Sequence, residues 1–188
     1  MIQNEKIEVV DEMKIVEYIL TSDLKTCSNT DYIIKKAYAR MWIIRRLKGL
    51  GATKIRLLDV LQKQVLSVLN LGVPAWDSLL TEQEKEDFER VLKTGLKIIW
   101  GQDYTNFYDI LRESNLKTMK QVRETIVKKF LRKTIEHTKF RRWFAEDRDP
   151  RMNTRAGNRT RFKPVPARKR FYQKSPIPTL TSLANTLI

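Results

Sequence analysis

Apolar positions recur every three or four residues from about residue 29 to residue 144, which predicts a mainly helical fold. Five stretches carry the pattern, and capping or stop residues bound them. Four of them cover residues 29–50, 54–71, 82–100 and 105–113. The fifth begins after Thr118 and includes Phe130, with Ile135 as an open extension and a last turn around Phe140, Trp143 and Phe144. Thr81 with Glu84, and Thr118 with Gln121, are typical of capping boxes at helix starts. The sequence therefore predicts a small bundle of four or five helices.

The apolar stripes also predict the buried face of each helix. The expected core residues are Ile34, Ala37, Met41 and Ile44, then Ile55, Leu58, Leu61, Val65 and Leu69, then Phe88, Val91, Leu92, Leu96 and Ile99, and finally Val122, Ile126 and Phe130. The acidic cluster of Glu84, Glu86, Asp87 and Glu89 opens the third helix. These carboxylates are expected to face solvent and to complement the helix dipole.

The N-terminal stretch has a different pattern, because β-branched residues dominate positions 5–20. Two short strands over 6–10 and 13–20, broken at Asp11-Glu12, would form a hairpin. An isolated hairpin is marginally stable, so we expect a partner sheet or a helix to cover it.

The apolar period vanishes after Asp147. Residues 148–174 are rich in Arg, Lys, Asn and Pro and are expected to be disordered. Residues 175–188 regain apolar content, and the sequence leaves two alternatives for them. They either dock back on the folded part of the chain or form a short helix. We thus expect a strand hairpin over 1–27, a helical domain over 28–147 and a basic, largely disordered tail over 148–188.

The charge is distributed unevenly along the chain. The formal net charge is +15, and residues 139–188 hold 13 Lys/Arg against 3 Asp/Glu. A basic tail on a folded body is typical of polyanion binding. One Cys and one His cannot supply a zinc site, and no phosphate-binding Gly-rich loop occurs. We expect no cofactor, no enzymatic activity by this chain alone and no membrane partner, and an intracellular location in nucleus or cytoplasm.

Basic residues gather in three places. Lys35, Trp42 and Arg46 share one arc of the first helix, where a cation–aromatic strip can pair with phosphates and stack on a base. The alternative is that Trp42 packs on a second element. The candidate nucleic-acid-binding residues are Lys35, Lys36, Arg40, Trp42, Arg45, Arg46, Lys128, Lys129, Arg132, Arg155, Arg159, Arg161, Lys163, Arg168, Lys169 and Arg170.

Both later groups have plain alternatives. Lys128, Lys129 and Arg132 can be a solvated helix end, where cations are favoured. Arg168-Lys169-Arg170 can be a nuclear-import signal. In the tail, Arg alternates with aromatic residues that include Phe162 and Tyr172, which suits bidentate phosphate contact and stacking.

Several stretches follow one another in a recognisable order. They are Lys14 to Lys25, Asn29 to Ile33, Ala37 to Leu47, Val73-Pro74 with Trp76, Glu89 to Lys93, Ile98-Ile99 and Lys174 to Thr181. Their order resembles the C-terminal part of non-LTR retrotransposon reverse transcriptases. The resemblance implies the end of a polymerase palm, a helical thumb and a basic tail. By that likeness the hairpin stands where the family places its primer grip, and the first helices would follow a template–primer duplex.

The implied partner is RNA or an RNA–DNA duplex, bound mostly through phosphates, with a separate palm and finger segment supplying the polymerase aspartates. Val16-Glu17 stands where the family has Leu-Gly, which puts bulk and negative charge where backbone would approach nucleic acid. Two other classes remain open. One is an inactive assembly module that folds only against a missing palm, and the other is a free-standing basic structural protein of a ribonucleoprotein.

Overall fold

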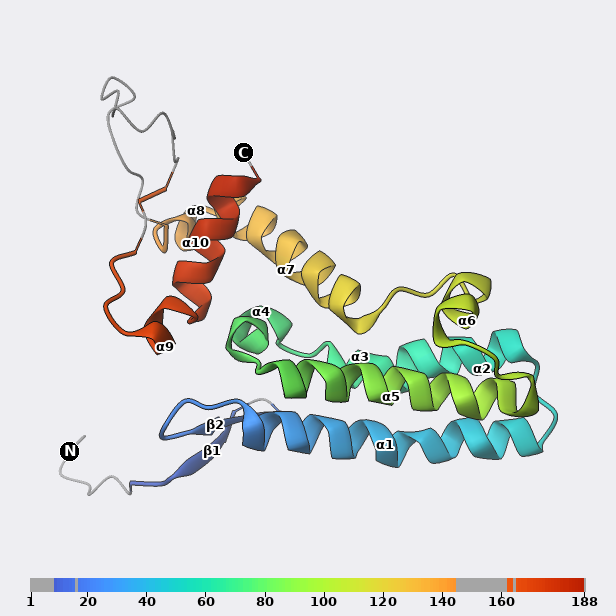
Figure 1. The fold of residues 1–188 in the computed structure, drawn as a ribbon. Helices are drawn as coiled ribbons and strands as arrows, with labels where there is room; N and C mark the ends of the chain where they lie inside the picture. The colour runs from blue at the N-terminus through green and yellow to red at the C-terminus, as the bar shows by residue number, and fades with distance from the viewer. Residues whose placement is uncertain (1–8, 16, 145–161, 164, 188) are drawn as a thin grey trace. The chain divides into compact units, whose positions relative to one another are not determined.

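Helices dominate the residues that the computed structural model describes, namely 9–15, 17–144, 162–163 and 165–187 (Figure 1). A short antiparallel hairpin precedes them, so the mainly α fold expected from the sequence is confirmed. Contacts divide the chain into two compact units. The first unit comprises Met1–Leu71 and Thr81–Leu116, and the second unit comprises Gly72–Leu80 and Lys117–Ile188. These units cut across the three consecutive segments expected from the sequence.

The hairpin of the first unit pairs β1 (Glu12–Ile15) with β2 (Tyr18–Thr21). The predicted strand positions were wrong, because 13–20 was taken as one strand. Residues 9 and 10 are not in a strand, and residues 6–8 lie outside the described part. The reason is local: Glu17 has a φ of +69°, in the left-handed region, which ends the extended run.

In the first unit the long N-terminal helix is contacted by the two helical stretches that follow it, 54–69 and 82–100 (Figure 1). The helical elements of this unit are α1 (Cys27–Gly49), α2 (Lys54–Val60), a π-helical segment (Leu61–Leu66), α3 (Ser67–Leu69), α5 (Glu82–Trp100), a 3-10 turn (Gly101–Asp103) and α6 (Phe107–Glu113). The capping box of Thr81 and Glu84 is confirmed at the start of α5. Each predicted helix is therefore present, within a few residues of its expected ends.

The buried face of α5 agrees with its stripe, since all five predicted residues are buried. The other two stripes needed correction. In α1 the predicted residues Ala37, Met41 and Ile44 are buried, but Ile33 is buried where Ile34 was expected, and Ile34 is only partly buried. In α2 the buried residue is Leu57, and Ile55 is 80% exposed. Periodicity alone allowed either neighbour, and packing against α5 decided between them.

The correction in α2 agrees with the spacing of the buried residues that follow Leu57. Leu57, Leu61, Val65 and Leu69 are buried and follow each other in steps of four. Such steps drift around an ordinary α-helix, which has 3.6 residues per turn, and the wider π-helical segment counteracts the drift.

Gly95 of α5 faces this π-helical segment. A Cβ at Gly95 would lie 2.5 Å from Leu61 Cδ1, so the absence of a side chain lets the two helices meet.

Glu84 is buried, which corrects the expectation that it faces solvent. Its Oε1 accepts hydrogen bonds from the hydroxyls of Thr26 and Thr30, both at 2.9 Å. Its Oε2 accepts from the backbone N–H and the hydroxyl of Thr81, both at 2.8 Å. Burial opposes ionisation of Glu84, but these hydrogen bonds outweigh it and hold the pKa below its usual value. One carboxylate thus joins the start of α1 to the start of α5.

The second unit is built from α4 (Val73–Trp76), a 3-10 turn (Asp77–Leu79), α7 (Met119–Glu136), α8 (Thr138–Arg141), α9 (Arg170–Gln173) and α10 (Pro176–Thr186). The capping box of Thr118 and Gln121 is confirmed. The predicted apolar face of α7 was wrong, since Leu131 is fully buried while Phe130 is exposed. Leu131 packs in a core that also contains Phe144, Phe162, Leu180 and Ala184.

That core includes Phe162, which lies in the segment 148–174 that was expected to be disordered. Phe162 is fully buried, and the Asn185 side chain clamps its backbone. The Phe162 N–H donates to Asn185 Oδ1 and the Asn185 amide donates to the Phe162 carbonyl, both at 2.9 Å. Pro176–Thr186 takes the helical alternative left open above. Residues 148–161 lie outside the described part, so the expectation stays untested there.

Candidate nucleic-acid interface

The exposed face of α1 carries the cation–aromatic strip predicted from the helical wheel. Lys35, Trp42, Arg45 and Arg46 are all exposed, and Trp42 is 62% exposed. Trp42 is thus largely uncovered among the described residues, which favours the strip over the alternative in which Trp42 packs on a second element. The opposite face of α1 is buried, which turns this strip outward.

Sequence reasoning missed one member of the strip. Tyr38 is 37% exposed, and it precedes Trp42 by one helical turn on the same face. Its three- and four-residue spacing to Lys35 and Trp42 was the available signal. Two aromatic rings and three cations thus share one exposed stripe of α1.

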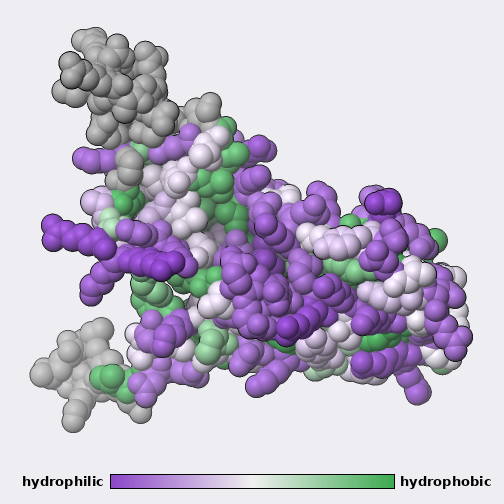
Figure 2. Space-filling view, in the orientation of Figure 1, coloured by the Kyte–Doolittle hydropathy of each residue, from purple (hydrophilic) through white to green (hydrophobic). Residues whose placement is uncertain are grey.

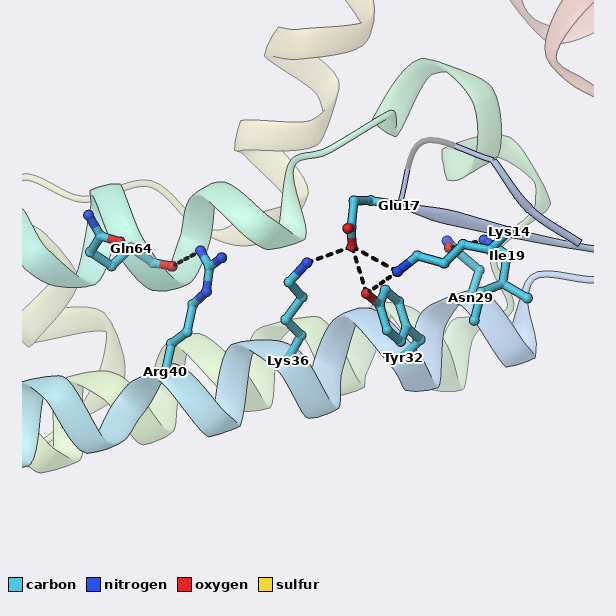
Figure 3. Close-up of polar contacts among 8 residues, drawn as sticks. All are labelled: Lys14, Glu17, Ile19, Asn29, Tyr32, Lys36, Arg40 and Gln64. Carbon is cyan, nitrogen blue, oxygen red and sulfur yellow. Dashed lines mark hydrogen bonds and ion pairs between the residues drawn. The ribbon is translucent and has the colours of Figure 1, made fainter.

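Two other candidates in α1 are engaged within the protein. Lys36 Nζ lies 2.6 Å from Glu17 Oε2, and Arg40 Nη1 donates to the Gln64 carbonyl at 2.8 Å. Figure 3 shows both side chains on the face of α1 directed toward these oxygens. Because their donors have protein partners, Lys36 and Arg40 are weaker candidates for phosphate contact than Lys35, Arg45 and Arg46.

Glu17 is the centre of a small charged cluster. Its Oε2 accepts hydrogen bonds from Lys36 and from the Tyr32 hydroxyl, both at 2.6 Å, and lies 3.4 Å from Lys14 Nζ (Figure 3). The two ammonium groups also lie over the Tyr32 ring, at 4.8 and 5.5 Å from its centroid. The hydrogen bond from Lys36, then that from Tyr32, lowers the pKa of Glu17 to about 2.

This cluster bears on the expectation that Glu17 would repel nucleic acid. Two lysines compensate the carboxylate, so its negative charge is not isolated on the surface.

A separate hydrogen bond, from the Ile19 N–H to Asn29 Oδ1 at 3.1 Å, connects β2 to α1. The element that contacts the hairpin, through β2, is therefore the helix α1, one of the two possibilities that the sequence left open.

The cations of α7 are exposed as a group. Lys128, Lys129 and Arg132 are all exposed, whereas Leu131 of the same helix is buried in the core. A partly buried ion pair connects this helix to the 3-10 turn of its unit, because Arg123 Nε lies 2.8 Å from Asp77 Oδ1. The local sequence pattern could not predict this ion pair, because 46 residues separate Arg123 from Asp77.

The candidates near the end of the chain divide into two groups. Lys163, Arg168, Lys169 and Arg170 are exposed. Arg155, Arg159 and Arg161 lie outside the described residues. The predicted alternation of Arg with aromatic residues holds only in part, because Phe162 is buried in the core whereas Phe171 and Tyr172 are about half exposed.

The division into units sharpens the charge asymmetry. The first unit holds 17 Lys/Arg and 16 Asp/Glu, and the second unit holds the remaining 20 Lys/Arg and 6 Asp/Glu. The second unit therefore carries a formal charge of +14 out of +15. A sequence count over the last quarter alone had missed the contribution of α7.

Other kinds of site find little support in the described part of the chain. No group of three or more His, Cys, Asp and Glu side chains there could hold a metal ion. No described helix is both long and apolar enough to cross a membrane. Comparisons with protein-family models, curated proteins and solved structures give no match to this chain.

Proposed function

We propose that the protein binds nucleic acid through phosphate contacts made by its exposed cations. The observation that carries the proposal is the excess of 20 Lys/Arg over 6 Asp/Glu in the second unit. Such a surface attracts phosphate backbones, and each contact releases condensed counterions. The exposed strip of α1 adds aromatic rings on which a base can stack.

The contacts of this surface favour position over sequence. Phosphate contacts orient a protein on nucleic acid but do not read bases. We therefore expect binding to RNA or an RNA–DNA duplex with little sequence preference. The resemblance described above supports a thumb-like role beside a reverse transcriptase palm, in which a separate segment would supply the catalytic aspartates.

A salt titration tests the proposal directly. Fluorescence anisotropy of a labelled RNA–DNA duplex would be measured with the full chain and with the triple variant Lys128→Gln, Lys129→Gln, Arg132→Gln. Loss of each phosphate contact should reduce the slope of log K against log salt by about 1. The triple variant should therefore bind more weakly and with a shallower slope.

A matched control removes the same charge elsewhere. Lys63, Lys85 and Arg90 each form an ion pair with a carboxylate three or four residues away. Their triple replacement by Gln should change the slope less than the α7 variant does. Equal slopes in the two triple variants, or no binding by the parent chain in dilute buffer, would contradict the proposal.

The hairpin favours a second candidate function, that of an assembly module. All of β1 is exposed, with Met13 52% exposed, and among the described residues only β2 pairs with it. An exposed strand edge with apolar side chains is a template for pairing with another strand. If this function holds, Met13→Lys should reduce concentration-dependent association in sedimentation velocity. A parent chain that stays monomeric at every concentration tested would exclude the assembly module.

A further inference from the structure

The second unit contains an apolar cavity of about 730 Å³. Residues of α4 and α10 line it together with the side chains of Phe130, Trp143 and Tyr172. Its lining is almost entirely apolar. Pockets for small ligands span roughly 300–1,000 Å³, so the volume suits a compact organic group. Figure 2 shows apolar residues, in green, on the visible face of this unit over α7 and α10.

The three aromatic rings of the cavity are open to solvent, although they are large and apolar. Phe130, Trp143 and Tyr172 each keep more than a third of their surface exposed. Trp143 also contacts another aromatic ring, since its ring centroid lies 4.9 Å from that of Phe140. Exposed aromatic surface grouped in one hollow is typical of a binding site.

The charged residues that neighbour the lining residues in the sequence indicate the chemistry of the occupant. Lys129 adjoins Phe130, Arg142 adjoins Trp143, and Lys174 follows Tyr172 by two residues; all three cations are exposed. None of the residues that line the cavity is acidic. An occupant with a flat apolar body and flanking negative charges is complementary to this arrangement.

We propose that this cavity receives an unpaired base of single-stranded nucleic acid, while the adjacent cations hold the flanking phosphates. The inference rests on the proposed function and adds the substrate class that this unit prefers. A base in a duplex is stacked between its neighbours, whereas a single-stranded base is free to stack on aromatic side chains. Because the lining offers almost no polar groups to base edges, the site is tolerant of sequence.

Two neighbouring residues of α9 provide the test. Tyr172 lines the cavity, whereas Phe171 does not, and their exposed fractions are 47% and 46%. Tyr172→Ala removes a stacking ring from the cavity, and Phe171→Ala removes an equally exposed ring beside it. Tyr172→Phe keeps the ring and should restore binding. Circular dichroism and thermal melting of each full-length variant would show that its fold is retained.

The assay compares one short, labelled RNA of mixed sequence as a single strand and as a duplex with its complement. Loss of one base–aromatic stack weakens binding roughly ten-fold or more. Tyr172→Ala should show this loss for the single strand only, and Phe171→Ala and Tyr172→Phe should bind both RNAs like the parent. Trp143→Leu should weaken single-strand binding in the same way.

The outcomes separate this inference from the proposed function. Duplex and single strand bound equally, with all variants alike, would overturn the base site and leave phosphate binding intact. Failure of the parent chain to bind either RNA in dilute buffer would overturn both. Displacement of the single strand by an oligo-glutamate peptide, with the same sensitivity to Tyr172→Ala, would assign the cavity to an acidic peptide and also overturn the base site.

Discussion

Replacement of Glu84 by Ala should destabilise the first unit severely. The substitution removes a carboxylate that accepts four hydrogen bonds and joins the starts of α1 and α5. The hydroxyls of Thr26 and Thr30 would be left buried without this acceptor, and each such loss costs about 1–3 kcal/mol. Loss of the reciprocal contact at the Thr81 cap adds about 1 kcal/mol.

The expected total is a decrease of about 3–7 kcal/mol in the free energy of unfolding. That is a large share of the roughly 5–15 kcal/mol that stabilises a typical domain. Glu84→Gln keeps the shape and one acceptor oxygen, and its amide can donate to a threonine hydroxyl. We therefore expect a smaller decrease of about 1–2 kcal/mol for Glu84→Gln.

Urea denaturation followed by far-UV circular dichroism measures both changes. Glu86→Ala is the matched control, because Glu86 lies two residues later in α5, is exposed and contacts Arg90 at 3.6 Å. Its effect should stay within about 0.5 kcal/mol. The reasoning is refuted if Glu84→Ala costs no more than Glu86→Ala, because the buried network would then contribute nothing to stability.

Three further changes test other parts of the fold. Gly95→Ala should lower the free energy of unfolding by about 1–2 kcal/mol in urea denaturation, because its Cβ would meet Leu61 Cδ1 and this overpacking outweighs the gain in helix propensity. Asn185→Ala should lower the free energy of unfolding by about 2 kcal/mol in thermal melting, because the two hydrogen bonds between the Asn185 side chain and the Phe162 backbone are lost. Amide exchange at Phe162 should also become faster, and unchanged exchange would contradict the role of these hydrogen bonds. The pKa of Glu17 is lowered from 4.5 to about 2, so its contribution is present above pH 4.5 and is lost as pH falls toward 2, which NMR signals of the hairpin should follow; a transition well above pH 4.5 would contradict this sign.

Much of the candidate interface was predictable because it depends on local spacing. Lys35, Trp42 and Arg46 share an arc of any helix, and their exposure follows once the opposite stripe is buried. Lys36 and Arg40 could not be separated from them in this way. Their partners, Glu17 and the Gln64 carbonyl, come from other elements and are brought near only by packing.

The amino-acid pattern by itself determined the helices, the two capping boxes and the buried face of α5, because these depend on residues three or four positions apart. Tertiary structure alone decided which carboxylate is buried and which aromatic residues are exposed. Glu84 meets Thr26 across 58 residues, and Phe162 meets Asn185 across 23. The cavity of the second unit likewise forms from α4, α7, α9 and α10, whose meeting no local period encodes. Local sequence gives each helix its faces, and only the packed chain determines what each face contacts.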